Sequence, residues 1–389
     1  MPEEEQQHLS GLRVLWVSHG YGYGGDLMYF GEIFSRFRAI FPKTEIGVDE
    51  DTIYKNPYDI KLTKIAKFFR FPIKRFGDEG QIYEMETVFP SPSIFLELIK
   101  SPADVFITIE FTAPALLTTL AATISKRRRL VLLVESDPAP RGGSKNWLVR
   151  LVKRWAVSQA DIIQTNNEKG KRYLIEDLGA APGKIRVAPY LTSRPPGPEV
   201  EIPASKGPLR ILFANSIAPR KGLRQLIDAL SRLPRATLNN VALTVVGDGP
   251  ERAELELAAA QLDMGERLQF VGRRAYSELG AFYSAAEVLA VPSLADYRSL
   301  AGFEGLGYGL ALLSSKYDGA TEETIPADGT TGYVIDPLDG NSLAGAIEKL
   351  VENRDLVASM RRSSINLYRS AYSLERITQN LRKTVEAAL

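Results

Sequence analysis

Apolar residues follow two repeating patterns along the chain. Short, nearly uninterrupted apolar runs at residues 12–18, 105–109, 130–134 and 162–165 indicate strands that are buried on both faces. Longer segments with apolar residues every three or four positions, at residues 27–40 and 147–157, indicate helices that face a core. Since strands and helices alternate, we expect a doubly wound parallel sheet of the α/β class.

The alternation stops and then starts again. Residues 191–208 contain Ser193-Arg-Pro-Pro-Gly-Pro-Glu and the later Pro203 and Gly207, which is typical of a linker. Beyond it we expect strands at residues 209–214, 241–247 and 268–271, and helices at 222–233, 251–262 and 276–286. The prediction is two Rossmann-like domains, residues 1–190 and 209–370, with a binding cleft between them because ligands bind beyond the carboxyl ends of such strands.

Composition narrows the function classes. The chain has 389 residues, which is enough for two domains with separate cores. Its net charge is +1, so nothing in the overall charge points to nucleic acid. It has no cysteine and only 2 histidines, which excludes disulfides and thiolate chemistry and argues against a transition-metal centre. The start, Met1-Pro-Glu-Glu-Glu, lacks the basic residues of a secretory signal, and residues 111–124 are too short and Thr-rich to span a bilayer. We expect a cytoplasmic enzyme.

The segment from Pro292 to Glu304 carries the strongest chemical signal. It connects an apolar strand to a helix, and it places Asp296 in the loop and Glu304 in the helix with seven residues between them. Ser299 and Leu300 mark the start of that helix, where unpaired amides and a partial positive charge attract an anion. A carboxylate one turn further along can accept both hydroxyls of a ribose.

This arrangement resembles the donor site of retaining GT-B glycosyltransferases of family four, whose pattern is Glu, seven residues, Glu. The resemblance covers nearly all of residues 209–389. Arg220 and Lys221 resemble the pair that holds the donor diphosphate, and both side chains suit phosphate oxygens. Gly247-Asp-Gly-Pro250 resembles a structural turn of the family, and Arg273 lies in the segment that resembles its nucleotide-base loop. The resemblance also implies that the last helix, in residues 371–389, returns to the first domain.

The chain departs from the family in the same segment. Asp296 stands where the family has Glu, so its carboxylate is withdrawn by about 1.5 Å, the length of one C–C bond. Tyr297-Arg-Ser replaces the usual Gly-Phe-Gly. Gly305 and Gly307 are unfavourable inside a helix, and close approach to a ligand would explain them. A helix C-cap is the expectation for Gly309.

The glycine-rich loop after the first strand has two interpretations. Gly20, Gly22 and Gly25, with Asp49 downstream, satisfy the dinucleotide-binding pattern and favour an NAD(P)-dependent oxidoreductase. The resemblance instead implies that Gly24 and Gly25 approach the donor phosphates. Because a dehydrogenase does not need the Arg-Lys pair and paired carboxylates of the second domain, we favour the glycosyltransferase.

Two further segments of the first domain are candidates for function. The family often carries a histidine after a middle strand, and the corresponding stretch here offers Glu135 or Asp137 instead; we take Asp137 as the catalytic candidate, with a helix-capping role as the alternative. Residues 61–76 mix basic and aromatic side chains, which suits either an anionic membrane surface or a packed helix. Residues 145–157, with Trp147 and Trp155, are expected to form a helix that faces the core, and a contribution to the same membrane surface is the alternative.

The resemblance implies a metal-independent transfer of a sugar from a UDP- or GDP-linked donor to an acceptor hydroxyl, with retention of anomeric configuration. The expected catalytic residues are Arg220, Lys221, Asp296 and Asp137. Donor contacts are expected from Gly24, Gly25, Arg220, Lys221, Arg273, Asp296, Ser299, Leu300 and Glu304. The expected acceptor is a saccharide or a lipid-linked glycan in cell-surface polysaccharide or glycolipid synthesis, reached at the inner face of the membrane. No cofactor, metal or nucleic acid is expected. A non-catalytic nucleotide-sugar binding protein is the other alternative.

Overall fold

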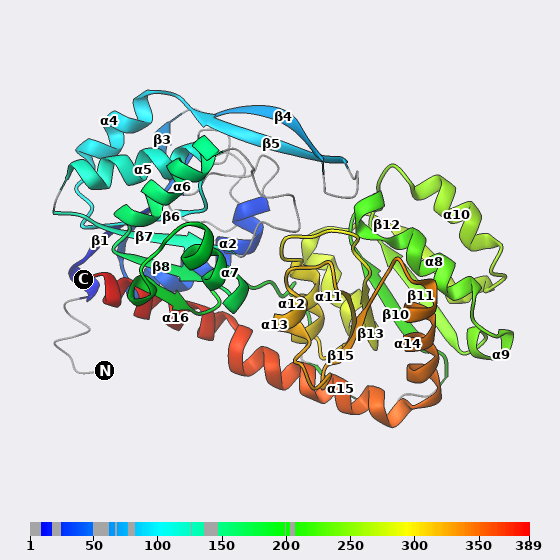
Figure 1. Cartoon of the computed structure of the whole chain (residues 1–389). Helices are drawn as coiled ribbons and strands as arrows, with labels where there is room; N and C mark the ends of the chain where they lie inside the picture. Colours follow the sequence, from blue (N-terminus) through cyan, green and yellow to red (C-terminus); the bar gives the residue numbers. More distant parts are fainter. Residues whose placement is uncertain are drawn as a thin grey trace. The chain divides into compact units, whose positions relative to one another are not determined.

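A computed structural model describes residues 9–17, 25–49, 62–66, 68–76, 82–125, 127–135, 147–198, 200–202 and 207–389. The chain divides into two compact units. Unit 1 contains Met1–Leu191 and Leu374–Leu389, and unit 2 contains Thr192–Ser373. Each unit has its own parallel sheet and its own core, and each is described separately below (Figure 1).

The sheet of unit 1 has seven strands in the order β3-β2-β1-β6-β7-β8-β9. Its strands are β1 (Arg13–Val17), β2 (Lys43–Asp49), β3 (Leu62–Ala66), β6 (Val105–Ile109), β7 (Arg129–Val134), β8 (Ile162–Thr165) and β9 (Ile185–Val187). All pair in parallel, and β6 and β8 are buried along their whole length. Continuous apolar runs therefore form central strands, as the sequence predicts.

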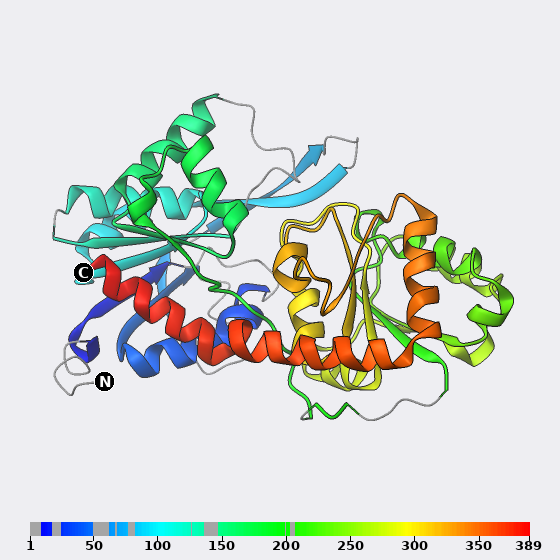
Figure 2. The ribbon, with the colours of Figure 1, turned by 60° about the horizontal axis from the view of Figure 1, so that its bottom comes forward.

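Helices cover both faces of this sheet (Figure 1). They are α2 (Gly25–Ile40), α4 (Ser93–Lys100), α5 (Ala113–Ile124), α6 (Trp147–Gln159), α7 (Glu168–Arg172), a π-helical turn at Tyr173–Asp177, a 3-10 turn at Pro182–Lys184, and α16 (Leu374–Ala388). The final helix α16 packs against α2, β7 and β8, so the end of the chain belongs to unit 1 (Figure 2). Among the described residues, no helix is both long and apolar enough to cross a bilayer.

Within residues 61–76, the described stretches 62–66 and 68–76 form strands, so the alternative of a packed helix was wrong. They contribute β3 and then β4 (Phe68–Phe76), which pairs with β5 (Ile82–Pro90) in an antiparallel hairpin. Pro72 is tolerated within β4 because the hairpin has only two strands, and proline is accepted where one edge of a strand carries no partner.

The expectation that residues 145–157 face the core was also wrong for most of that segment. Helix α6 forms at Trp147–Gln159, but residues 147–152 are all exposed, and the buried residues of the helix are Ala156 and Val157. Periodicity identified the helix correctly. It could not show that only the last turns of α6 reach the sheet.

The sheet of unit 2 has six strands in the order β12-β11-β10-β13-β14-β15. They are β10 (Leu209–Ala214), β11 (Val241–Val246), β12 (Leu268–Gly272), β13 (Val288–Val291), β14 (Ala311–Ser315) and β15 (Gly332–Ile335). The surrounding helices are α8 (Leu223–Ser231), α9 (Arg235–Leu238), α10 (Arg252–Ala260), α11 (Tyr276–Ala285), α12 (Leu300–Gly307), α13 (Thr321–Thr324), α14 (Gly340–Glu352) and α15 (Arg354–Leu367), with 3-10 turns at Pro219–Lys221 and Gly265–Arg267 and a π-helical turn at Tyr368–Tyr372. The first strand in sequence, β10, lies at the centre, between β11 and β13.

The glycines of α12 serve packing within unit 2. A Cβ on Gly305 would meet Leu289 Cδ2 at 2.8 Å and Leu312 Cδ2 at 2.9 Å, so α12 lies directly on strands β13 and β14. The interpretation of Gly305 as a ligand contact was therefore wrong. Gly309 follows the helix with a φ of 61°, the left-handed conformation expected of a C-cap.

Candidate functional site

The candidate site lies where the strand order of unit 2 reverses. Successive connections lead from β10 outwards to β11 and β12 on one side, and to β13, β14 and β15 on the other. Loops leaving the carboxyl ends of β10 and β13 therefore meet at the edge where α/β sheets bind ligands. The first of these loops carries Arg220 and Lys221, and the second carries Asp296.

Backbone contacts hold the two loops together. The amide of Leu294 donates to the carbonyl oxygen of Arg220 at 2.8 Å. Gly222 has a φ of 74°, and a Cβ there would lie 1.9 Å from the carbonyl oxygen of Pro292. Only glycine permits both this backbone conformation and this close approach. Gly222 thus fixes where the Arg-Lys turn lies relative to the strand that leads to Asp296.

Three predicted residues form one charged cluster. Lys221 Nζ donates a hydrogen bond to Asp296 Oδ2, and Arg220 Nη1 lies 3.3 Å from the same oxygen. Lys221 and Asp296 are each only 7% exposed, whereas the Arg220 side chain is more accessible. Two cations from the loop after β10 therefore contact one carboxylate from the loop after β13. A buried pair of this kind is costly unless it is fully paired or serves a ligand.

A fourth charged residue, Asp318, completes the cluster. The backbone of Asp296 bridges to this segment, because Gly319 donates to the Asp296 carbonyl oxygen at 3.1 Å. Asp318 Oδ1 accepts the amides of Ser299 at 3.1 Å and Ala320 at 2.9 Å. Burial and the neighbouring Asp296 carboxylate together raise the pKa of Asp318 to about 6. Asp318 lies in the loop that follows β14 and was not among the residues expected at the donor site.

The amide of Ser299 is therefore engaged by a carboxylate. Ser299 precedes α12, whose first residue is Leu300. This placement agrees with the expected start of the helix. The Asp318 carboxylate binds at this helix N-terminus, where the amides attract an anion. A diphosphate that used the Ser299 amide would have to replace the Asp318 oxygen.

Glu304 lies in the middle of α12 and is held by two hydroxyl groups. Ser193 Oγ donates to Oε1 at 2.6 Å, and Tyr283 Oη donates to Oε2 at 2.5 Å. Tyr276 Oη in turn lies 2.8 Å from Ser193 Oγ. Burial raises the pKa of Glu304, while the two hydroxyls act in the opposite direction. The hydroxyls fix the orientation of the carboxylate, since each of its oxygens has one donor. Neither Ser193 nor Tyr283 carried a signal in the sequence.

The segment that replaces the family's Gly-Phe-Gly forms a buried ion pair. Arg298 binds Glu323 through two parallel hydrogen bonds, Nε to Oε1 at 2.9 Å and Nη2 to Oε2 at 2.8 Å. The guanidinium also lies over the ring of Phe303, 4.1 Å from its centroid. Such a bidentate pair is geometrically specific. It anchors the loop between Asp296 and α12 to the neighbouring helix α13.

The remaining predicted residues are one of unit 2, Arg273, and three of unit 1, Gly24, Gly25 and Asp137. Arg273 is exposed after β12, an edge strand that β11 separates from β10. Gly25 is the first residue of α2 in unit 1. Gly24 and Asp137 lie outside the described residues. Glu135 is described, and its amide donates to Glu110 Oε1 at 2.6 Å. Glu110 has a φ of 59°, an unusual conformation for a residue other than glycine, at the end of β6.

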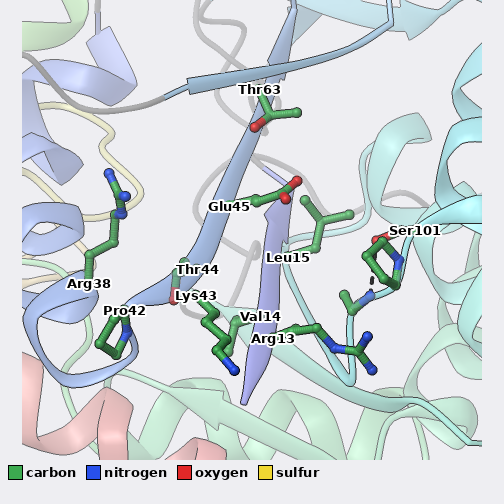
Figure 3. Close-up of a pocket in the computed structure, with 12 residues that line it drawn as sticks. Arg13, Val14, Leu15, Arg38, Pro42, Lys43, Thr44, Glu45, Thr63 and Ser101 are labelled. Carbon is green, nitrogen blue, oxygen red and sulfur yellow. Dashed lines mark hydrogen bonds between the residues drawn. The ribbon is translucent and has the colours of Figure 1, made fainter. Parts of the chain in front are cut away.

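A separate cavity of about 190 Å³ lies in unit 1 (Figure 3). It is lined by the first residues of β1 and β2, among them Arg13, Lys43 and Glu45, and by Ser101. Arg13 pairs with Asp104, with Nη2 and Oδ1 2.6 Å apart. These residues lie at the amino ends of the strands, whereas an α/β sheet binds its ligand at the carboxyl ends. No group of side chains with the arrangement of a metal site occurs in the part of the chain that the structure describes.

Comparisons with known proteins concern mainly unit 2. Residues 199–366 match the family model described as glycosyl transferases group 1. A 2-deoxystreptamine glucosyltransferase of Streptomyces kanamyceticus is 32% identical over 47% of this chain and 51% of its own. A D-inositol 3-phosphate glycosyltransferase of Stackebrandtia nassauensis is 30% identical over 59% of this chain and 54% of its own. The chain thus spans about half the length of these two curated relatives.

The fold of the whole chain also has solved counterparts. HepE from Anabaena, solved in complex with UDP, superposes with a TM-score of 0.72 at 18% identity. The alignment covers 97% of this chain and 100% of HepE. At this identity the likeness concerns the fold, and it includes both units.

Proposed function

We propose that this chain, whose residues 199–366 match the glycosyl transferases group 1 family model and whose fold is GT-B, transfers a sugar from a nucleotide-diphosphate donor to an acceptor hydroxyl. The observation that carries the proposal is the convergence of Arg220 and Lys221 on Asp296 at the β10–β13 switch point. A donor diphosphate brings the negative charge that such a pair of cations attracts.

Binding of the donor would redistribute the partners of this cluster. The diphosphate oxygens take the cations, and Asp296 is then available for the hydroxyls of the sugar. Glu304, whose carboxylate is oriented by Ser193 and Tyr283, accepts the ribose hydroxyls with its remaining lone pairs. UDP is the nucleotide we favour, because HepE was solved with it.

The reaction breaks the bond between the anomeric carbon and the diphosphate oxygen and forms one to the acceptor oxygen. The acceptor proton passes to the departing diphosphate. Arg220 and Lys221 stabilise the charge that develops on that diphosphate, which is commonly the largest single contribution to catalysis. We propose that anomeric configuration is retained and that no metal is required.

The acceptor we propose is a saccharide or lipid-linked glycan of cell-surface polysaccharide or glycolipid synthesis, reached from the cytoplasmic side of a membrane. The basic and aromatic residues of unit 1 support a membrane-associated acceptor. Asp137 remains our candidate for orienting the acceptor hydroxyl.

Donor binding tests the proposal directly. The thermal midpoint of the protein is measured with UDP-, GDP-, ADP- and TDP-sugars in the presence of EDTA, with NAD(H) and NADP(H) as controls. One nucleotide sugar should raise the midpoint, since a ligand that binds only the folded state stabilises it. Release of free sugar or transfer to added acceptors then separates an enzyme from a binding protein. A shift with NAD(P) alone would overturn the assignment.

A further inference from the structure

Asp318 uses only one of its two carboxylate oxygens at the start of α12. Oδ1 accepts the amides of Ser299 at 3.1 Å and Ala320 at 2.9 Å. Oδ2 accepts no hydrogen bond from any residue in the part of the chain that the structure describes. The residue is nevertheless only 3% exposed. Because a buried carboxylate oxygen without a partner is costly, Oδ2 is suited to hold a proton or to contact a ligand.

The formal charges around Asp318 cancel before a donor binds. Arg220 and Lys221 are the cations, and both contact Asp296. Asp296 and Asp318 are the anions, and their carboxylates repel each other. A donor diphosphate adds a negative charge on each of its phosphate groups, so the sum becomes negative beside two buried carboxylates. Since burial penalises uncompensated charge, we expect a proton to neutralise one carboxylate when the donor binds.

Asp318 is the carboxylate that takes this proton more readily. Asp296 contacts two cations, whereas Asp318 forms no ion pair with any described residue. Burial and the Asp296 carboxylate raise the pKa of Asp318 to about 6, and the Lys221 ammonium acts in the opposite direction. A diphosphate that pairs with Lys221 cancels that opposing charge. The pKa of Asp318 should therefore be higher in the donor complex than in the free protein.

The remaining charged and titratable groups of the surrounding elements have their own partners or are exposed. They are Arg298, Glu304, Lys316, Tyr317, Glu322 and Glu323, from the loops after β13 and β14 and from α12 and α13. Arg220 acts on Asp318 only through its contact with Asp296. Asp296 and Lys221 are thus the charged groups that determine the protonation of Asp318.

We propose that Asp318 takes up a proton from solvent when the donor binds and then donates a hydrogen bond from Oδ2 to the diphosphate; this role rests on the donor site proposed above. Oδ1 keeps the amides of Ser299 and Ala320, so the carboxyl group stays in place. The neutral acid supplies a hydrogen-bond donor where the Ser299 amide is already engaged. At high pH the carboxylate keeps its charge and repels the diphosphate, so donor affinity should fall as the pH rises.

Calorimetric titration of the full chain measures this proton uptake without any variant. The probes are UDP-glucose and GDP-glucose, whose diphosphate esters keep their charge between pH 6 and pH 8. Titrations at pH 7 in two buffers that differ in their heat of ionisation give the number of protons taken up. We expect about one proton per bound nucleotide sugar, and an affinity that falls about tenfold from pH 6 to pH 8.

Asp318→Asn separates the proton from the structural contacts of this residue. The side-chain amide keeps an oxygen for the amides of Ser299 and Ala320 and places a permanent donor near the position of Oδ2. This variant should bind without proton uptake, with an affinity that is independent of pH and about tenfold above that of the wild type at pH 8.

Asp339→Asn is the matched control. Asp339 Oδ1 also accepts an amide at a helix start, that of Asn341 at 2.9 Å, but Asp339 is exposed. Its variant should keep the proton uptake and the pH dependence of the wild type, because it removes a similar carboxylate outside the charged cluster.

Two results would overturn the role of Asp318 alone. They are binding of a nucleotide sugar to the wild type without proton uptake, and a pH dependence of affinity that persists in Asp318→Asn. Failure of both probes to bind at any pH would overturn the donor site itself, and the role of Asp318 with it. A change in the stability of Asp318→Asn does not imitate the expected result, because lower stability does not abolish proton uptake by the folded protein.

Discussion

The two units place charged and apolar side chains in opposite ways. Among the described residues, every buried charged side chain lies in unit 2; these are Lys221, Glu287, Asp296, Arg298, Glu304, Asp318, Glu323 and Arg361. The buried polar side chains described in unit 1 are all neutral. Most exposed large apolar side chains, in contrast, belong to unit 1. Among the described residues, unit 2 thus concentrates buried charge, whereas unit 1 concentrates exposed apolar side chains.

The largest effect on the free energy of unfolding is predicted for the buried ion pair of unit 2, which joins Arg298 and Glu323. Arg298→Met should lower the free energy of unfolding by about 3–5 kcal/mol, because Glu323 is left buried without its partner. Arg13→Met removes an exposed ion pair of unit 1 and should cost much less, because water screens that pair. Urea unfolding of both variants makes the measurement. Equal losses of unfolding free energy in the two variants would mean that burial of an ion pair does not determine how much it contributes to stability.

The second prediction concerns Lys221. Lys221→Met should lower kcat by about 10²–10³-fold, as when one preorganised donor is removed from an oxyanion site. Arg220 still neutralises Asp296 at 3.3 Å, so the folded state should survive. Steady-state kinetics and the thermal midpoint are measured together, with Lys316→Met, an exposed pair with Asp336, as the control. Turnover at the wild-type rate would refute the role of Lys221.

The third prediction uses pH. The pKa of Asp318 is about 6 in the folded state against an ordinary 3.8, so its contribution to stability is complete below about pH 4 and is lost as the pH rises through 6. Asp318→Asn should therefore become more stable relative to the wild type between pH 4 and pH 7, by up to about 3 kcal/mol. Urea unfolding across this range tests the sign. A difference that stays constant with pH would contradict it.

The fourth prediction concerns the orientation of Glu304. Tyr283→Phe removes one of its two hydroxyl donors and should weaken binding of UDP roughly tenfold, as expected for a hydrogen bond to a charged group. Binding of 2′-deoxy-UDP, which lacks one ribose hydroxyl, should change less. Calorimetric titration of both nucleotides gives the comparison. Equal losses would show that Tyr283 acts only on general stability.

The smallest effect is expected at the exposed apolar residues. Leu151→Glu in unit 1 and Leu257→Glu in unit 2 should each change the free energy of unfolding by less than about 0.5 kcal/mol, since neither side chain is buried. Urea unfolding of the two variants checks this. A large loss in Leu151→Glu alone would mean that the exposed side of helix α6 contributes to folding.

The sequence predicted the architecture well because hydrophobic periodicity reports burial directly. Both parallel sheets, the approximate strand positions and the helix that begins near Ser299 follow from it. For α6, where only Ala156 and Val157 are buried, the same pattern wrongly predicted a helix that faces the core along its length. Periodicity does not show how far a helix extends beyond its sheet.

By itself, the sequence determined which chemical groups are available. Arg220 and Lys221 follow the strand at residues 209–214, and Asp296 and Glu304 follow the strand at residues 288–291. Only the tertiary structure decided which groups meet. It brought Asp318 beside Asp296 and Ser193 onto Glu304, across 111 residues of chain. The reason is that local sequence sets backbone conformation and burial, whereas the strand order of the sheet sets which loops converge at its edge.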